Sequence, residues 1–178
     1  MKINFKDRTQ LIWLVLIALT LAFIFGQSML PASRSMQTSD GVADTVEHIL
    51  TPDSADGSDT EDGGAHRPVI DFFIKYLRKI AHFVEHGVLG LEMFFLLLTL
   101  EKRAGREHGI MPLGVTTLLF SLNLGLIVGF LDETIQIFSG RMYSIVDVWL
   151  DFAGYAAFTA VLTLVYVIAR LIKKTKTE

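Results

Sequence analysis

The 178-residue chain contains no cysteine, and it has fewer charged residues than a soluble domain usually carries. Without cysteine it cannot form disulfides, thiolate metal sites, cysteine nucleophiles or cysteine-linked lipid anchors. Charged residues make up 20% of the chain, whereas roughly a quarter is typical of soluble proteins. The net charge is −3, and neither a basic groove pattern nor a recognition motif for DNA or RNA is present. A soluble globular enzyme and a nucleic-acid-binding protein are therefore both disfavoured.

Three long stretches of the chain have no charged residue and no histidine. They are Thr9–Ser33, Ile110–Leu131 and Phe152–Ala169. A stretch of about 18 such residues is long enough for a helix to cross the hydrocarbon layer of a bilayer. A fourth segment, from about Ile80 to Leu100, is apolar except for His82, Glu85, His86 and Glu92. We therefore predict an all-α, polytopic membrane protein with four transmembrane helices.

Composition divides the chain into four regions. They are a basic head with the first transmembrane helix (1–33), an acidic loop (34–67), the helical membrane core (68–170) and a basic tail (171–178). Eight Asp and Glu residues but no Lys or Arg lie between Ser35 and His66, which favours a mobile extracytoplasmic loop. These acids lack the spacing of a calcium-binding EF-hand. Val69–Lys79 combines apolar residues at helical spacing with charged ones, which predicts an amphipathic surface segment before the second span.

Basic residues in the short segments outside the spans predict the orientation. Three Lys or Arg lie in residues 1–8, three in residues 101–109 and four in residues 170–178. Four spans place all three segments on one side of the membrane, and the positive-inside rule makes that side cytoplasmic. We therefore expect both termini inside the cell. The first span could instead be a signal peptide, but its length and the lack of a clear cleavage site favour a retained helix.

Polar residues inside the spans carry most of the functional information, because an unpaired ionisable group is costly in hydrocarbon. Three pairs with i,i+4 spacing each share one helix face, namely His82–His86, Asp132–Gln136 and Asp147–Asp151. The expected orientation puts all three pairs at the outer ends of spans two, three and four, with Arg141 in the connection between the last two. Glycines that would let these helices approach closely are Gly87, Gly90, Gly125, Gly129 and Gly154. The sequence therefore predicts one polar cluster near the outer leaflet.

Three functions are open for this cluster. The first is a binding site without a cofactor, formed by Lys79, His82, Asp132, Glu133, Gln136, Arg141, Asp147 and Asp151. There, Lys79, His82 and Arg141 would contact an anionic group, or the carboxylates would hold a cation. The second is an intramembrane metal-dependent enzyme, with His82 or Glu133 as general base and a divalent metal held by the Asp pairs. The third is a purely structural cluster that joins the helices.

Residues 82–86 also match H-x-x-E-H, a zinc-binding motif of hydrolases. In that motif two histidines one turn apart bind the metal, and the glutamate acts as general base. The candidate residues are His82, Glu85 and His86. Such short patterns also arise by chance, and no distinctive partner motif supplies a third ligand. The interpretation without a metal is therefore preferred from the sequence.

Three segments give the chain a resemblance to the VanZ-like family of small bacterial membrane proteins. They are Arg78–Gly90, Asp132–Arg141 and Ser144–Val148, the last followed by Asp151 and Gly154. The resemblance implies a helical domain in the bacterial cytoplasmic membrane and, for some members, low-level resistance to teicoplanin-type glycopeptide antibiotics. It further implies the lipid bilayer as a partner, together with a lipid-linked cell-wall precursor or the glycopeptide. Many similar proteins have an aromatic residue at the position of His86.

Overall fold

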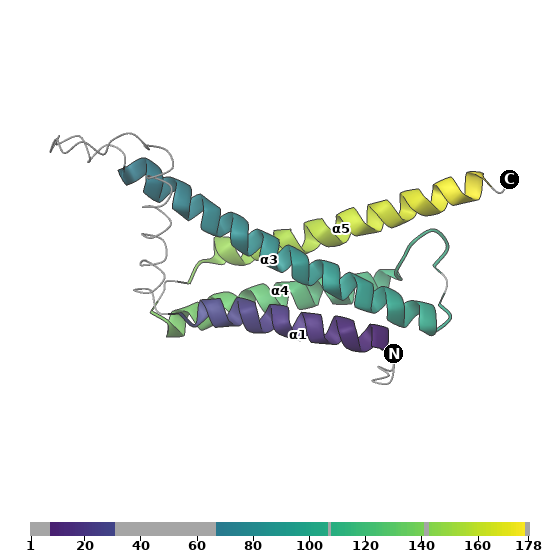
Figure 1. Ribbon diagram of the computed structural model, residues 1–178, viewed down its shortest axis with the longest axis horizontal. Coiled ribbons are helices and arrows are strands. Elements are labelled where there is room, and N and C mark those ends of the chain that lie inside the picture. Colours follow the sequence, from purple (N-terminus) through teal and green to yellow (C-terminus); the bar gives the residue numbers. More distant parts are fainter. Residues whose placement is uncertain (1–7, 31–66, 107, 141–142, 177–178) are drawn as a thin grey trace.

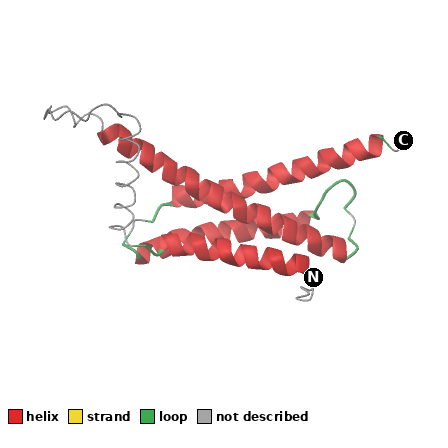
Figure 2. Cartoon of the chain, viewed as in Figure 1, coloured by secondary structure: helices red, strands yellow, loops and turns green. Residues whose placement is uncertain are grey.

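The computed structural model describes residues 8–30, 67–106, 108–140 and 143–176, which form four long helices (Figure 1). The helices are α1 (Arg8–Ser28), α3 (Arg67–Arg103), α4 (Val115–Phe138) and α5 (Ile145–Thr175). No strand occurs in these described residues (Figure 2). Each helix is long and apolar enough to cross a membrane, and the apolar part of α3 is Tyr76–Arg103. The predicted all-α fold with four spans is thus confirmed.

The helix boundaries refine the predicted regions. Helix α3 runs without interruption from Arg67 to Arg103, so the segment predicted to be amphipathic forms its first turns and leads directly into the span. Helix α5 continues to Thr175, beyond the predicted start of the basic tail. Lysines in its last turn suit a helix continuation, because cations interact favourably with the negative end of the helix dipole. The predicted acidic loop falls almost entirely on residues 31–66, outside the described residues, and its mobility stays a prediction.

The four helices form an antiparallel bundle in which successive helices run in opposite directions (Figure 1). Helix α3 contacts each of the other three, and its contact with α5 is the most extensive. We call the two ends of the bundle the α4–α5 end, where α4 finishes and α5 begins, and the α3–α4 end, where α3 finishes and α4 begins. The start of α1 and the finish of α5 both lie at the α3–α4 end.

Helix α3 is the central helix. In the most apolar 18-residue stretch of α3, 56% of the residues are buried inside the protein. The corresponding share is 17–22% in the other three helices. Large apolar side chains such as Ile12, Phe120 and Trp149 are exposed on those outer helices. Such apolar exposure suits contact with lipid tails and would be unusual for a soluble monomer.

Glycines set the close approach of α3 to its neighbours. A Cβ atom added to Gly154 on α5 would lie 2.1 Å from the carbonyl oxygen of Phe83, and one added to Gly90 on α3 would lie 2.6 Å from the carbonyl oxygen of Tyr155. Gly125 on α4 faces the Tyr155 ring in the same manner. Helix backbones can approach this closely only where a side chain is absent. The predicted packing role of the glycines is confirmed.

A buried acid, Glu101, organises the α3–α4 end. Its carboxylate accepts a hydrogen bond from the Thr117 hydroxyl, lies 3.3 Å from His108 Nε2 and lies 3.6 Å from Arg106 Nη1. The Arg170 guanidinium of α5 donates to the carbonyl oxygen of Gly109 nearby, at 3.0 Å. We call Glu101, Arg106, His108 and Thr117 the Glu101 cluster. The cluster joins α3, the following turn and α4. Both carboxylate oxygens of Glu101 have a hydrogen-bond or ion-pair partner.

Candidate functional site

The first turn of α5 begins the polar cluster at the α4–α5 end. Ser144 caps the helix, and its hydroxyl accepts from the backbone N–H of Asp147 at 3.3 Å. This cap satisfies one of the N–H groups that a helix start leaves without a partner. The Lys79 ammonium of α3 then donates to Asp147 Oδ1 at 2.7 Å. An ion pair therefore links α3 to α5, and both of its side chains are about one-third exposed.

Helix α4 contributes a buried polar face in its last turns. Gln136 donates from Nε2 to Glu133 at 2.8 Å and to Asp132 at 3.3 Å. The other Glu133 oxygen accepts from the backbone N–H of Ser144 at 3.0 Å. Because Glu133 is hydrogen-bonded both within α4 and to the residue that caps α5, it fixes where α5 starts.

Asp132 connects this face to α1 and α3. Its side chain is completely buried. The Ser28 hydroxyl in the last turn of α1 donates to Asp132 Oδ1 at 2.5 Å, and His82 Nδ1 lies 3.8 Å from Oδ2. His82 also lies 4.0 Å from Glu85, one turn along α3. The cluster therefore draws on all four helices, whereas the sequence predicted three.

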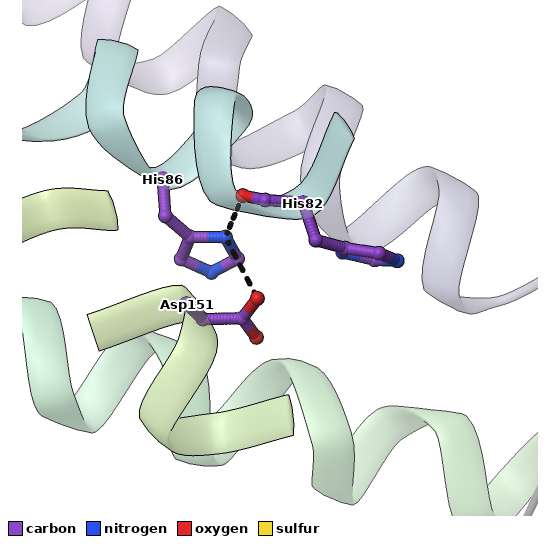
Figure 3. A group of neighbouring side chains, drawn as sticks. All are labelled: His82, His86 and Asp151. Atoms are coloured by element: carbon purple, nitrogen blue, oxygen red, sulfur yellow. Dashed lines mark hydrogen bonds and ion pairs between the residues drawn. The ribbon is translucent and has the colours of Figure 1, made fainter. Parts of the chain in front are cut away.

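His86 and Asp151 meet where α3 packs on α5 (Figure 3). Their side chains are 0% and 1% exposed, and His86 Nδ1 lies 3.5 Å from Asp151 Oδ1. The same Nδ1 atom lies 3.1 Å from the carbonyl oxygen of His82. Among the described residues, no hydrogen-bond partner is found for either Asp151 oxygen or for His86 Nε2. Buried polar atoms without partners are rare in native proteins, because each loses its hydration without compensation.

We call these residues together the four-helix polar cluster. Its members are Ser28, Lys79, His82, Glu85, His86, Asp132, Glu133, Gln136, Ser144, Asp147 and Asp151. Seven of the eight residues proposed from the sequence as a binding set are brought together here. The eighth, Arg141, lies outside the described residues, so its predicted contact stays a prediction.

Two members of the cluster were not predicted from the sequence, and one polar residue of α3 lies elsewhere. Ser28 and Ser144 carry neutral hydroxyls, and they escape a search for ionisable residues. The cap signal, a serine followed three residues later by an acid, could have identified Ser144. Glu92 accepts a hydrogen bond from Thr20 of α1 at 2.9 Å. It therefore joins α1 to α3 further along the helix.

Two overlapping groups of side chains have metal-ligand character. One is His82, His86 and Asp151, and the other is Asp132, Glu133 and Asp151. Within each group, one possible ligand atom per residue lies within 4.8 Å of the others. The second group differs from the first in that Asp132 and Glu133 already accept hydrogen bonds from Ser28, Gln136 and Ser144. The H-x-x-E-H motif is thus placed against an acid of α5 that the sequence did not mark as its third ligand.

Carboxylates outnumber cations in the cluster. Five acids are present, and Lys79 is the one Lys or Arg that forms an ion pair with them among the described residues. Such an excess of negative charge in a low-dielectric environment is unfavourable unless the acids are protonated, bind a cation or gain a basic partner. The cluster can therefore accept hydrogen bonds from hydroxyl or amide groups, hold a cation or exchange protons.

Four helices that are long and apolar enough to cross a membrane, with a buried ionisable cluster at one end of the bundle, fit a multi-pass membrane protein. A family model described as VanZ/LLP1 matches residues 12–168, and the chain therefore belongs to the VanZ/LLP1 family. The match covers α3 and α4 completely, most of α1 and α5, and the whole four-helix polar cluster. Neither a curated protein nor a solved structure was found to match the chain.

Proposed function

We propose that this VanZ/LLP1 protein resides in the bacterial cytoplasmic membrane and binds an envelope component at the four-helix polar cluster. The ligand would be a lipid-linked cell-wall precursor or a teicoplanin-type glycopeptide, and binding would confer low-level resistance to such antibiotics. The single observation that carries this proposal is the buried Asp151–His86 pair, which has atoms without a hydrogen-bond partner among the described residues. A cluster that served only to join helices would gain stability by satisfying those atoms.

The chemistry of the cluster suits a ligand with both anionic and hydroxyl groups. Lys79 is 37% exposed and can turn its ammonium from Asp147 to a phosphate or carboxylate. His82 is partly exposed beside it and offers a second donor. The carboxylates of Asp132 and Glu133 accept hydrogen bonds such as those from sugar hydroxyls or peptide amides. In this proposal Gln136 positions both carboxylates, and Arg141 supplies a further positive charge from the loop.

The proposal places the α4–α5 end on the outer side of the membrane, in agreement with the positive-inside rule. Single cysteines test this directly, because the chain has none of its own. A cysteine at Phe138, which is 87% exposed at the finish of α4, should react with a membrane-impermeant maleimide in intact cells. A cysteine at Lys174, at the other end, should react only after the cells are opened. The opposite labelling pattern would refute the proposed orientation.

Antibiotic susceptibility tests the binding proposal. The chain and its variants would be expressed in a teicoplanin-sensitive bacterium, with the amount of inserted protein measured for each. Asp151→Asn, Glu133→Gln and Lys79→Met should abolish the rise in the inhibitory concentration of teicoplanin. Thr134→Ala is a matched control on α4, because within the described part of the chain the Thr134 hydroxyl bonds only to the carbonyl oxygen of Phe130 in its own helix. Resistance that persists in the three variants would overturn the proposal.

A second candidate function is a metal-dependent hydrolase or transferase that acts on a lipid-linked substrate. The two groups of candidate metal ligands favour it. In this mechanism His82 or Glu133 would act as general base, and the Asp pairs would hold a divalent metal that would supply Lewis-acid activation at the phosphoryl group of the lipid. Purified protein incubated with a lipid-linked pyrophosphate precursor would release the water-soluble product in this case. Stoichiometric binding of the precursor without turnover would instead support the binding function.

A further inference from the structure

We propose that the four-helix polar cluster holds one divalent transition-metal ion, Zn²⁺ in particular, with His82, His86 and Asp151 as its protein ligands. This inference rests on the proposed function, because both treat the four-helix polar cluster as a binding site. Unlike the proposed function, it can be tested on the purified protein without an antibiotic or an envelope lipid.

The spacing of the donor atoms suits one ion. A possible ligand atom from each of the three residues lies within 4.8 Å of the other two. In a tetrahedral zinc site with bonds of 2.0–2.2 Å, the ligand atoms are about 3.3–3.6 Å apart. Figure 3 shows His86 and Asp151 facing each other across the contact of α3 with α5, whereas the His82 ring is turned away. A ring nitrogen of His82 nevertheless lies within 4.8 Å of the candidate ligand atoms of His86 and Asp151.

Two of the three proposed ligands, His86 and Asp151, have buried atoms without a hydrogen bond among the described residues. Both Asp151 oxygens and His86 Nε2 lack hydrogen bonds although they are buried. The His86 Nδ1 atom lies 3.1 Å from the carbonyl oxygen of His82. A proton on Nδ1 would be donated to that carbonyl and would leave the lone pair on Nε2. Metal-binding histidines are usually oriented by this type of backbone contact.

The acids on the other side of Asp151 are less suitable ligands. Asp132 accepts hydrogen bonds from Ser28 and Gln136, and Glu133 accepts from Gln136 and the Ser144 N–H. Binding a metal there would break contacts that already hold α1, α4 and α5 together. Asp151 has no such contacts, and a cation bound to it lowers the electrostatic cost of its acidic neighbours. One ion at the histidine side of Asp151 is therefore favoured over an ion among the three carboxylates.

The donor set also selects the kind of metal. Two imidazoles and a carboxylate suit zinc and its transition-metal neighbours, whereas Mg²⁺ and Ca²⁺ prefer oxygen ligands alone. Three protein ligands leave a fourth position on zinc for an external group. A phosphate or carboxylate oxygen of an envelope ligand would fit that position. This explains how a cluster rich in acids can attract an anionic ligand.

Metal analysis of the full-length protein in mild detergent tests the inference. The protein is stripped with a chelator, equilibrated with Zn²⁺ and titrated against a zinc-binding dye. We expect about one Zn²⁺ per chain and no comparable binding of Mg²⁺. Asp151→Asn and His86→Phe should weaken zinc binding at least about tenfold. His108→Ala is the matched control, because His108 lies in the Glu101 cluster at the opposite end, and its zinc binding should equal that of the wild type.

Three outcomes would overturn the inference: no zinc in the wild type, unchanged binding in both ligand variants, or equal loss in His108→Ala. Folding of each variant is checked by thermal denaturation without metal, and Zn²⁺ should raise the melting temperature of the wild type but not of Asp151→Asn. Failure of the two proposals can be told apart. Zinc binding without antibiotic resistance would refute the resistance proposal alone, whereas resistance lost in Asp151→Asn with no zinc in the wild type would refute the metal site alone.

Discussion

Two acids, Glu101 and Asp151, are equally buried at opposite ends of the bundle, but their surroundings differ. Both are 1% exposed. Glu101 accepts from Thr117 and lies near both His108 and Arg106. Among the described residues, Asp151 forms an ion pair with His86 alone, at 3.5 Å, and neither of its oxygens has a hydrogen bond. The first acid connects helices, and we propose that the second binds a ligand.

This difference separates a structural use of a buried charge from a functional one. A buried acid with complete partners offsets its desolvation within the protein. One with incomplete partners lowers the stability of the free protein and is retained where binding needs it. The Glu101 cluster and the four-helix polar cluster should therefore respond in opposite ways to substitution, and four predictions test that contrast in order of decreasing effect on stability.

The largest effect is expected for Gly154→Ala. The new methyl group would meet the Phe83 carbonyl oxygen at 2.1 Å, and α3 and α5 would have to separate, at a cost of about 3 kcal/mol or more. Since this contact also brings Asp151 to His86, both stability and resistance should fall. Thermal denaturation in detergent gives the first quantity, and drug susceptibility gives the second. Gly26→Ala is the control, because no atom lies within 4 Å of its added Cβ. A Gly154→Ala protein as stable as Gly26→Ala would show that the helices do not pack this way.

Glu101→Ala should have the next largest effect. The Thr117 hydroxyl and the partly buried His108 would lose their common acceptor, which should lower stability by about 1–3 kcal/mol. Glu101→Gln keeps an acceptor for Thr117 and should lower stability less. In both variants, any loss of resistance should be proportional to the loss of stability. Lost resistance at full stability would place Glu101 in a functional site and would break the contrast.

The Lys79–Asp147 pair should contribute little to stability. Both side chains are about one-third exposed, and pairs of this kind are worth about 1 kcal/mol or less. A double-mutant cycle with Lys79→Met and Asp147→Asn measures the coupling energy. A coupling of several kcal/mol would indicate a helix connector like that of Glu101 and would count against a Lys79 that is available to a ligand.

The smallest effect on stability is expected for Asp151→Asn. Replacing a buried carboxyl group that has no hydrogen bonds among the described residues by an amide of the same shape should leave the melting temperature unchanged or raise it slightly. Resistance should nevertheless be lost. A loss of stability as large as that of Glu101→Ala would mean that Asp151 has a structural role, and the functional interpretation would then fail.

Much of the fold could be predicted from the sequence. Burying charge in a bilayer is costly, and segments that cross the membrane are therefore recognised by their lack of charged residues. The long apolar stretches predicted the membrane-spanning helices. The i,i+4 pairs and the glycines predicted which faces of α3, α4 and α5 contact one another. The contribution of Ser28 could not be predicted, since the rotation of α1 against α4 depends on packing along its whole length. The Glu101 cluster was also missed, because its acid lies in a segment that composition marks only as a basic turn.

Cysteine cross-linking tests the central claim most directly at the contact that brings α1 into the four-helix polar cluster, where Ser28 meets Asp132 of α4. The chain has no cysteine of its own, so Ser28→Cys with Asp132→Cys can be oxidised in native membranes and cut at a protease site inserted between residues 31 and 66. The two fragments should stay joined on a non-reducing gel, whereas the control pair Ser28→Cys with Asn123→Cys should separate. Fragments that separate in the first pair, or stay joined equally in both, would contradict the cluster.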